Sequence, residues 1–261
     1  MDESARYSAK IFLNAVIPLW KEIVQRSDLE QKFAGKNGII QISTMTDEGK
    51  WATHFILEEG RITTKLGEAE SKPDLELAFK NVDDFNGFFK GTSKKLPKIN
   101  GLFKLGLLVP TMQGLLKMAS TLGAKTAPAK KEDRELLTRM MLYLLSAGIS
   151  TLNKQGHPMV SAWAKKSPDR VYAWAVNGYE DLGAYIRVKA GNSKAARGIY
   201  TRSKPFFTMR FDDVESALGI LQQTADLLDL TAKKKLIMEG APEFGAKIGD
   251  LMMLVASYTL A

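Results

Sequence analysis

Two stretches of the chain, residues 8–26 and 133–153, place apolar side chains at the spacing of one face of an α-helix. In the first stretch the apolar positions are Ile11, Phe12, Ala15, Val16, Leu19, Trp20, Ile23 and Val24. In the second they are Leu136, Leu137, Met140, Met141, Leu144, Leu145 and Ile149. These stripes predict an amphipathic helix at the start of each half of the chain, and Pro18 predicts a kink in the first.

Shorter apolar runs, bounded by turn residues, predict the elements that follow each opening helix. The expected strands are 39–44, 53–58, 61–66 and 75–79 in the first half, and 171–176, 183–188, 198–201 and 206–211 in the second. Helices are expected at 82–91 and 212–228, followed in each half by a short strand that ends at Gly101 or Gly240. An apolar helix, 103–121 or 243–259, closes each half. This order predicts the α+β class, with a largely antiparallel five-stranded sheet covered by helices in each half.

The two halves also resemble each other residue by residue. The segment 71–79, Ser-Lys-Pro-Asp-Leu-Glu-Leu-Ala-Phe, resembles 203–211, Ser-Lys-Pro-Phe-Phe-Thr-Met-Arg-Phe, at an offset of 132 residues. The segment 94–101 parallels 233–240 at an offset of 139 residues. The matches occur in the same order in both halves, and short loop insertions explain the change in offset. The sequence therefore predicts an internal duplication.

The region between the two copies, residues 123–132, combines small residues, proline and charge, as linkers do. We therefore expect a first domain at 1–122, a linker at 123–132 and a second domain at 133–261.

Composition and charge exclude several kinds of site and partner but do not identify the function. The chain has 261 residues, 45% of them hydrophobic, and no cysteine, which excludes disulfides, thiolate metal sites and cysteine nucleophiles. The formal net charge is +8 and divides evenly, because residues 1–130 carry 19 basic and 15 acidic side chains and the rest carry 18 and 14. A nucleic-acid-binding protein usually concentrates its positive charge on one element, so none is expected as a partner. The charge is compatible with a transient contact with anionic membranes.

Targeting signals are weak. The N-terminus, Met-Asp-Glu-Ser, lacks the basic region of a signal peptide, and the most apolar long stretch, 101–122, contains Lys104, Pro110 and Lys117. We expect a cytoplasmic protein.

Candidate catalytic and metal-binding residues are few. His54 and His157 are the only histidines, the first in a predicted strand and the second before Pro158 in a predicted loop, so neither a His-rich metal site nor a catalytic pair is expected. The pairs 83–84 and 212–213, both Asp-Asp, stand at predicted helix starts, where carboxylates accept hydrogen bonds from free N–H groups. The sequence contains no phosphate-binding loop and no nucleophile elbow. No catalytic residue, metal or cofactor is therefore predicted.

Lysines gather at matching places in the two copies, at Lys94, Lys95 and Lys98 and at Lys233, Lys234 and Lys235. They could meet lipid headgroups near the mouth of an apolar site. They could equally protect an edge strand from aggregation, a common use of lysine. Both interpretations stay open.

The passage from strand to helix, and from a short strand through glycine into an apolar helix, occurs in both copies. In the first copy it is Leu-Glu-Leu-Ala-Phe at 75–79 before 82–85, then Lys-Ile-Asn-Gly at 98–101 before Leu-Phe-Lys-Leu at 102–105. The second copy repeats this pattern at 207–218 and 236–247. The order resembles the sterol carrier protein type 2 lipid-binding domain, here in tandem over nearly the whole chain.

The resemblance implies binding or carriage of a fatty acid, acyl-CoA, phospholipid or sterol in an apolar tunnel between the sheet and the last helix. The ligand-lining residues expected from it are Phe79, Phe85, Phe88, Phe89, Phe103, Leu107, Met112 and Leu115 in the first copy, and Phe207, Met209, Phe211, Leu218, Leu221, Phe244, Ile248 and Met252 in the second. The alternative is a non-catalytic scaffold or accessory subunit with a filled interior, in which the tandem acts as a pseudo-dimer. The sequence does not determine the oligomeric state.

Overall fold

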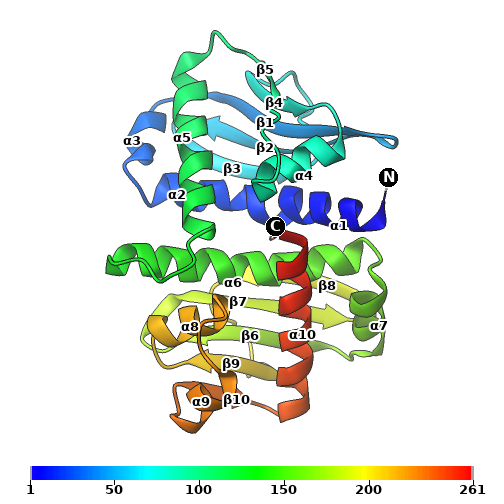
Figure 1. Cartoon of the computed structure of the whole chain (residues 1–261), viewed down its shortest axis with the longest axis vertical. Coiled ribbons are helices and arrows are strands. Elements are labelled where there is room, and N and C mark those ends of the chain that lie inside the picture. The colour runs from blue at the N-terminus through cyan, green and yellow to red at the C-terminus, as the bar shows by residue number, and fades with distance from the viewer. Residues whose placement is uncertain (1, 260–261) are drawn as a thin grey trace. The chain divides into compact units, whose positions relative to one another are not determined.

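The computed structural model describes residues 2–259, which divide into two compact units. Unit 1 runs to Ser120 and takes in a few residues from Ser257 onward, and unit 2 is Thr121–Ala256. Each unit contains one five-stranded mixed sheet with helices, so the chain belongs to the α+β class (Figure 1).

Unit 1 opens with helical segments and closes with a long helix. Its elements are α1 (Glu3–Ile11), a π-helical turn (Phe12–Val16), a 3₁₀ turn (Ile17–Leu19), α2 (Trp20–Gln25), α3 (Leu29–Phe33), β1 (Gly38–Thr46), β2 (Gly49–Glu58), β3 (Arg61–Leu66), β4 (Leu75–Phe79), α4 (Val82–Lys90), β5 (Lys98–Asn100) and α5 (Leu105–Leu122).

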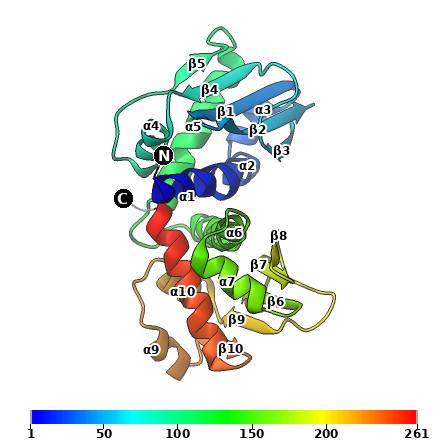
Figure 2. The same cartoon turned by 90° about the vertical axis from the view of Figure 1, so that its right-hand side faces the viewer.

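Unit 2 follows the same order, with the single helix α6 in place of the four opening helical segments of unit 1 and with one additional short helix, α9. Its elements are α6 (Lys131–Lys154), α7 (Pro158–Lys166), β6 (Arg170–Val176), β7 (Tyr179–Lys189), β8 (Asn192–Arg197), β9 (Phe207–Phe211), α8 (Val214–Leu221), α9 (Leu227–Ala232), β10 (Leu236–Glu239) and α10 (Pro242–Thr259). In unit 2, α6, α7 and α10 lie on one side of the sheet (Figure 2).

The two sheets have the same topology. Their strand orders are β3-β2-β1-β4-β5 and, in reverse, β8-β7-β6-β9-β10. The pairs β1–β4 and β6–β9 are parallel, and all the remaining pairs are antiparallel. The parallel register matches as well: Ile40 pairs with Leu75, and Tyr172, 132 positions after Ile40, pairs with Phe207, 132 positions after Leu75. The duplication predicted from the sequence is thus visible in the fold.

The same local devices place the equivalent elements. The side chain of Asn81 accepts a hydrogen bond from the backbone of Asp84 at the start of α4, and Asp213 accepts one from Ser216 at the start of α8. Gly101, with φ of 88°, brings its backbone so close to the carbonyl oxygen of Asp74 that an added Cβ would overlap it.

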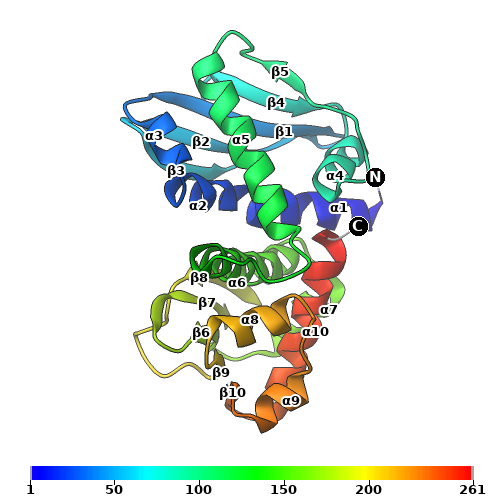
Figure 3. The ribbon, with the colours of Figure 1, turned by 60° about the vertical axis from the view of Figure 1, so that its left-hand side comes forward.

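A buried indole fixes the last helix of each unit against the rest of its unit. In unit 1 the Nε1–H of Trp20 donates to the carbonyl oxygen of Thr111 in α5, at 3.3 Å. In unit 2 the Nε1 of Trp174, from β6, lies 3.4 Å from the sulfur of Met252 in α10. Both indoles are fully buried. Figure 3 shows α5 crossing one face of the unit 1 sheet.

Two predictions of secondary structure were wrong. The helix expected at 212–228 is two helices, because the backbone after α8 turns through Gln223 with φ of 57°. The strand expected at 198–201 lies earlier, as β8, since Gly198 with φ of 80° ends the hairpin. The kink predicted at Pro18 is present: the opening helix at 8–26 is interrupted by the π-helical and 3₁₀ turns that precede and include Pro18, which has no N–H to donate. The helices α3 and α7 were not predicted.

Candidate functional site

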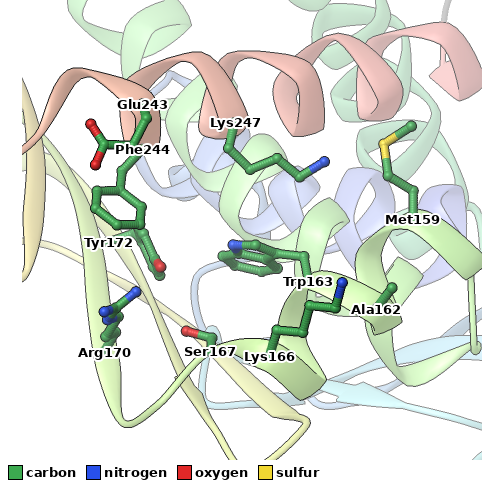
Figure 4. A pocket seen from close by; sticks show the side chains of 10 residues that line it. All are labelled: Met159, Ala162, Trp163, Lys166, Ser167, Arg170, Tyr172, Glu243, Phe244 and Lys247. Carbon is green, nitrogen blue, oxygen red and sulfur yellow. The ribbon is translucent and has the colours of Figure 1, made fainter.

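A pocket of about 520 Å³ lies in unit 2 between α7, the start of β6 and the start of α10 (Figure 4). It is lined by Met159, Ala162, Trp163, Lys166, Ser167, Arg170, Tyr172, Glu243, Phe244 and Lys247. The volume falls within the range of small-molecule sites, about 300–1,000 Å³.

One wall of the pocket is one face of α7. Met159, Ala162, Trp163 and Lys166 follow the spacing i, i+3, i+4, i+7, which places them on one side of a helix. The helix ends where the backbone N–H of Ser167 donates to the carbonyl oxygen of Trp163, at 3.1 Å.

The floor of the pocket is aromatic: its rings are Trp163, Tyr172 and Phe244 of the lining, which Phe206 joins from outside the lining. The ring of Trp163 lies 5.2 Å from that of Tyr172, which lies 5.8 Å from Phe206, and Phe206 lies 4.6 Å from Phe244. These centroid distances and their tilted or edge-on geometries are typical of favourable ring contacts. The hydroxyl-bearing ring of Tyr172 is buried, whereas Trp163 and Phe244 are half-buried and offer apolar surface to a ligand.

Three cationic side chains border this aromatic floor. The guanidinium carbon of Arg170 lies 3.8 Å from the ring centre of Phe206 and 5.1 Å from that of Phe244. Stacking of this kind holds the guanidinium plane in place while its edge keeps N–H donors for a carboxylate or phosphate. Lys166 and Lys247 reach the pocket from α7 and α10. Figure 4 shows the one carboxylate of the lining, Glu243, pointing away from the centre of the group.

Of the sixteen ligand-lining residues predicted from the sequence, Phe244 lines this pocket. In unit 1, Phe79, Phe85, Phe88 and Phe89 form one aromatic cluster, with neighbouring ring centres 4.9–6.0 Å apart. The cluster joins β4 to α4.

The remaining predicted residues of unit 1 differ in solvent exposure. Leu107 and Leu115 are buried and Met112 is half-buried, all in α5. Phe103 precedes α5 and is 98% exposed.

The other predicted residues of unit 2 are buried between its sheet and its helices. They are Phe207, Met209, Phe211, Leu218, Leu221, Ile248 and Met252. Whether any of them contacts a ligand stays a prediction.

Sequence reasoning missed most of the pocket, namely Trp163, Lys166, Arg170 and Lys247. The available signal was the apolar and aromatic spacing of residues 159–166, which is that of a short helix. Because the helix α7 was not predicted, the sequence offered no reason to place Trp163 beside other lining residues.

The histidines occupy structural positions. His54 is buried in β2, and its Nδ1 lies 2.8 Å from the carbonyl oxygen of Gly67. His157 is buried at the N-terminus of α7, directly before Pro158. Within residues 2–259, no group of three His, Asp or Glu side chains is close enough to hold a metal ion. Within the same range, no helix combines the length and apolarity needed to cross a membrane.

Unit 1 contains a second polar centre, the buried carboxylate of Glu76 on β4. It accepts hydrogen bonds from Gln41 (2.8 Å), Ser43 (2.7 Å), Lys50 (3.1 Å) and Asn100 (2.9 Å). Burial alone would raise the pKa of Glu76, but these hydrogen bonds outweigh it and lower the pKa to about 2. With four donors around two oxygens, the carboxylate is occupied by its own neighbours, as in a structural network.

No protein-family model matches the chain, and no curated protein matches it. Among solved structures, the chain is similar to sterol carrier protein 2, at 17% identity and a TM-score of 0.33, over 41% of this chain and 95% of the other. It is similar to a UbiJ-SCP2 ubiquinone synthesis protein, at 16% identity and a TM-score of 0.31, over 43% and 96%. It is also similar to a conserved hypothetical protein from Thermus thermophilus, described as possibly a sterol carrier protein, at 14% identity and a TM-score of 0.31, over 45% and 87%.

Proposed function

We propose that this protein binds or carries an amphipathic small molecule, and that the unit 2 pocket holds the part of it that joins an apolar chain to an anionic group. The observation that carries the proposal is the combination of an aromatic floor with Arg170, Lys166 and Lys247 around it. The candidate ligand classes are fatty acids, acyl phosphates and lysophospholipids.

The aromatic floor supports the apolar half of this proposal. Trp163 and Phe244 are half-buried, so a ligand that covers them removes apolar surface from water. Each CH₂ group buried in this way contributes about 0.8 kcal/mol. A fatty-acyl chain of about eleven methylenes would therefore contribute about 9 kcal/mol before the cost of association is subtracted, so the anionic group has to add to the affinity.

The charge distribution supports the anionic half. The lining carries three cations and one carboxylate, which faces outward. Arg170 is positioned by stacking on Phe206 and Phe244 and not by a carboxylate of the lining. Its N–H groups can therefore form a bidentate hydrogen-bonded pair with an anion.

Binding, and not catalysis, is the proposed role, because the lining offers no nucleophile next to a base. The hydroxyl of Ser167 donates to the carbonyl oxygen of Pro168, at 3.2 Å, and neither histidine belongs to the lining. A positioned base within hydrogen-bond reach is what activation of a serine requires.

The scaffold alternative has a specific observation in its favour. Trp20 and Trp174 are fully buried and contact the last helices, so aromatic rings already occupy space in which the resemblance places a lipid tunnel. Under that alternative unit 1 is solid, and the unit 2 pocket takes up no ligand in solution.

Calorimetric titration of the full chain with dodecanoate and with dodecan-1-ol separates these alternatives. We expect dodecanoate to bind one per chain and the alcohol, which has the same tail without the charge, to bind more weakly. Substitution Arg170→Met should reduce dodecanoate affinity about tenfold, the worth of a charge-assisted hydrogen bond.

A matched pair on α7 serves as control. Lys166 lines the pocket, whereas its exposed neighbour Lys165 does not. Lys166→Met should weaken dodecanoate binding and Lys165→Met should not, and Ala162→Trp should block the site. If neither dodecanoate nor dodecan-1-ol binds, or if the two lysine substitutions change dodecanoate affinity equally, the scaffold alternative is favoured.

A further inference from the structure

The turn between β5 and α5 of unit 1 presents a group of apolar side chains to solvent. Phe103 is 98% exposed, Leu105 61% and Leu102 52%. Leu96, just before β5, is 78% exposed. An isolated exposed leucine is ordinary, but a nearly fully exposed phenylalanine flanked by exposed leucines forms a patch. We call residues 102–105 the apolar tip.

The backbone of the tip is hydrogen-bonded. The N–H of Lys104 donates to the carbonyl oxygen of Gly101, at 2.9 Å, and the N–H groups of Leu107 and Leu108 donate to the carbonyl oxygen of Lys104. Gly101 has a positive φ and packs its backbone against Asp74. The tip is therefore a shaped turn that leads into α5, with its side chains already directed outward.

The charges around the tip have one sign. The segment 94–109 contains four lysines and no acidic residue. Lys94 and Lys98 are exposed. The other two pair with acids outside the segment, Lys95 with Asp84 at 2.7 Å and Lys104 with Asp74 at 3.5 Å. Both lysines of these pairs remain largely exposed, and such pairs are readily exchanged for other anions.

Unit 2 shows that the fold does not need this patch. The residues after Gly240, which is register-equivalent to Gly101, are Ala241, Pro242, Glu243 and Phe244. Phe244 turns inward and its ring lies 4.6 Å from Phe206. In unit 2 the strand therefore passes into the last helix, which begins earlier, at Pro242, without an exposed aromatic side chain and with an acid at the position equivalent to Lys104.

We propose that the apolar tip docks on an anionic lipid bilayer, with Phe103, Leu102 and Leu105 entering the interface and the lysines meeting the headgroups. Aromatic and leucine side chains insert favourably at the boundary between headgroups and acyl chains, and neighbouring lysines are attracted to the negatively charged headgroups. A second copy of this chain fits less well, because a symmetric contact would bring the four lysines of each copy against those of the other. The inference is independent of the unit 2 pocket.

The absence of cysteine from the chain allows a site-specific test. Phe103→Cys is labelled with an environment-sensitive dye, and Leu228→Cys serves as control, since Leu228 is 75% exposed but stands between Asp226 and Asp229 on α9. Each is mixed with vesicles of phosphatidylcholine alone or with about a third phosphatidylserine. We expect a blue shift and increased emission only for the label at 103, and only with phosphatidylserine.

Unlabelled variants measure the strength of docking by vesicle co-sedimentation. Phe103→Ser should lower the apparent affinity about tenfold or more, the worth of one buried aromatic side chain. Lys98→Gln should lower it about fivefold and reduce its salt dependence. Because both side chains are exposed, the variants should melt like the parent protein.

Three outcomes would overturn the proposal. The first is emission at 103 that does not change with phosphatidylserine vesicles. The second is vesicle binding that Phe103→Ser leaves intact, which would place the contact elsewhere. The third is concentration-dependent dimerisation removed by Phe103→Ser, which would assign the tip to a second copy. None of these results bears on dodecanoate binding by unit 2, so the two proposals fail separately.

Discussion

The two units share one topology and differ in where they put polar and apolar side chains. Unit 1 buries a carboxylate, Glu76, in a network on its sheet and exposes Phe103 at the start of its last helix. Unit 2 has Thr208 at the position equivalent to Glu76, and at the start of its last helix Phe244 is turned into a pocket bordered by cations.

The difference shows which positions the fold depends on. The inward-facing residues of the central strands are large and apolar in both units, for example Ile40 and Tyr172, or Leu77 and Met209. The register-equivalent residues on the opposite sheet face, Gln41 and Ala173, share no chemistry. The residues on the inward face of the central strands thus keep their apolar character in both units, while the opposite face and the start of the last helix have changed.

The largest predicted change in stability follows from removing the buried indole, Trp20 or Trp174, that contacts the last helix of each unit. Trp20→Ala and Trp174→Ala should each lower the free energy of unfolding by about 3–5 kcal/mol, because each leaves a large cavity next to α5 or α10. Urea titration followed by circular dichroism measures it. Trp51 is buried less completely, at 9% exposed, and stacks on Lys10, so Trp51→Ala should cost less. A small effect of Trp174→Ala alone would mean that the two units hold their last helices differently.

The second prediction concerns the carboxylate that only unit 1 has. Glu76 has a pKa of about 2 in the folded protein against an ordinary value of 4.5. A lowered pKa stabilises the fold at pH values above 4.5, and this stabilisation is lost as the pH falls from there through about 2. At neutral pH it amounts to at most about 3 kcal/mol.

Glu76→Gln should therefore destabilise the protein strongly at pH 7, and the difference from the parent should shrink as the pH is lowered toward 3. Unfolding by urea at a series of pH values measures this trend. Glu180, exposed on β7, provides the control, and Glu180→Gln should change stability little at any pH. A pH-independent difference for Glu76→Gln would show that the network stabilises through packing and not through charge.

Much of the fold followed from the sequence because apolar periodicity reports directly on burial. The strands 61–66 and 75–79 were placed to the residue, and the long helices to within two or three residues at each end. The repeat at an offset of 132 residues corresponds to the same parallel register in both sheets.

The pocket could not be predicted in the same way, because its residues are close only in the folded chain. Arg170 opens a strand, Trp163 belongs to a short helix and Lys247 to the last one. Apolarity also does not tell a buried position from an exposed one at the edge of an element. Phe103 stands two residues before α5 begins, where the helical pattern no longer fixes its direction.

A smaller effect is expected where a last helix approaches its unit closely. A Cβ added to Gly114 of α5 would overlap the indole nitrogen of Trp20, whereas Gly249 of α10 has open space around it. Gly114→Ala should therefore lower stability by about 1–3 kcal/mol. Gly249→Ala should raise it by about 0.5–1 kcal/mol, as alanine favours a helix over glycine. Thermal melts of both variants measure the contrast, and a gain from Gly114→Ala would contradict the close approach.

The smallest predicted effects lie at the helix caps, where the two units perform one task with different residues. Asn81→Ala and Asp213→Ala each remove a side chain that accepts a backbone N–H, from Asp84 and Ser216, and each should cost about 1 kcal/mol. Asp213 also pairs with Lys235 at 2.9 Å, and this half-exposed ion pair is worth well under 1 kcal/mol. Asp213→Asn, which keeps the cap and loses the charge, should therefore cost only a few tenths. If thermal melts show Asp213→Asn to be as damaging as Asp213→Ala, then the start of α8 depends on charge where the start of α4 depends on a hydrogen bond alone.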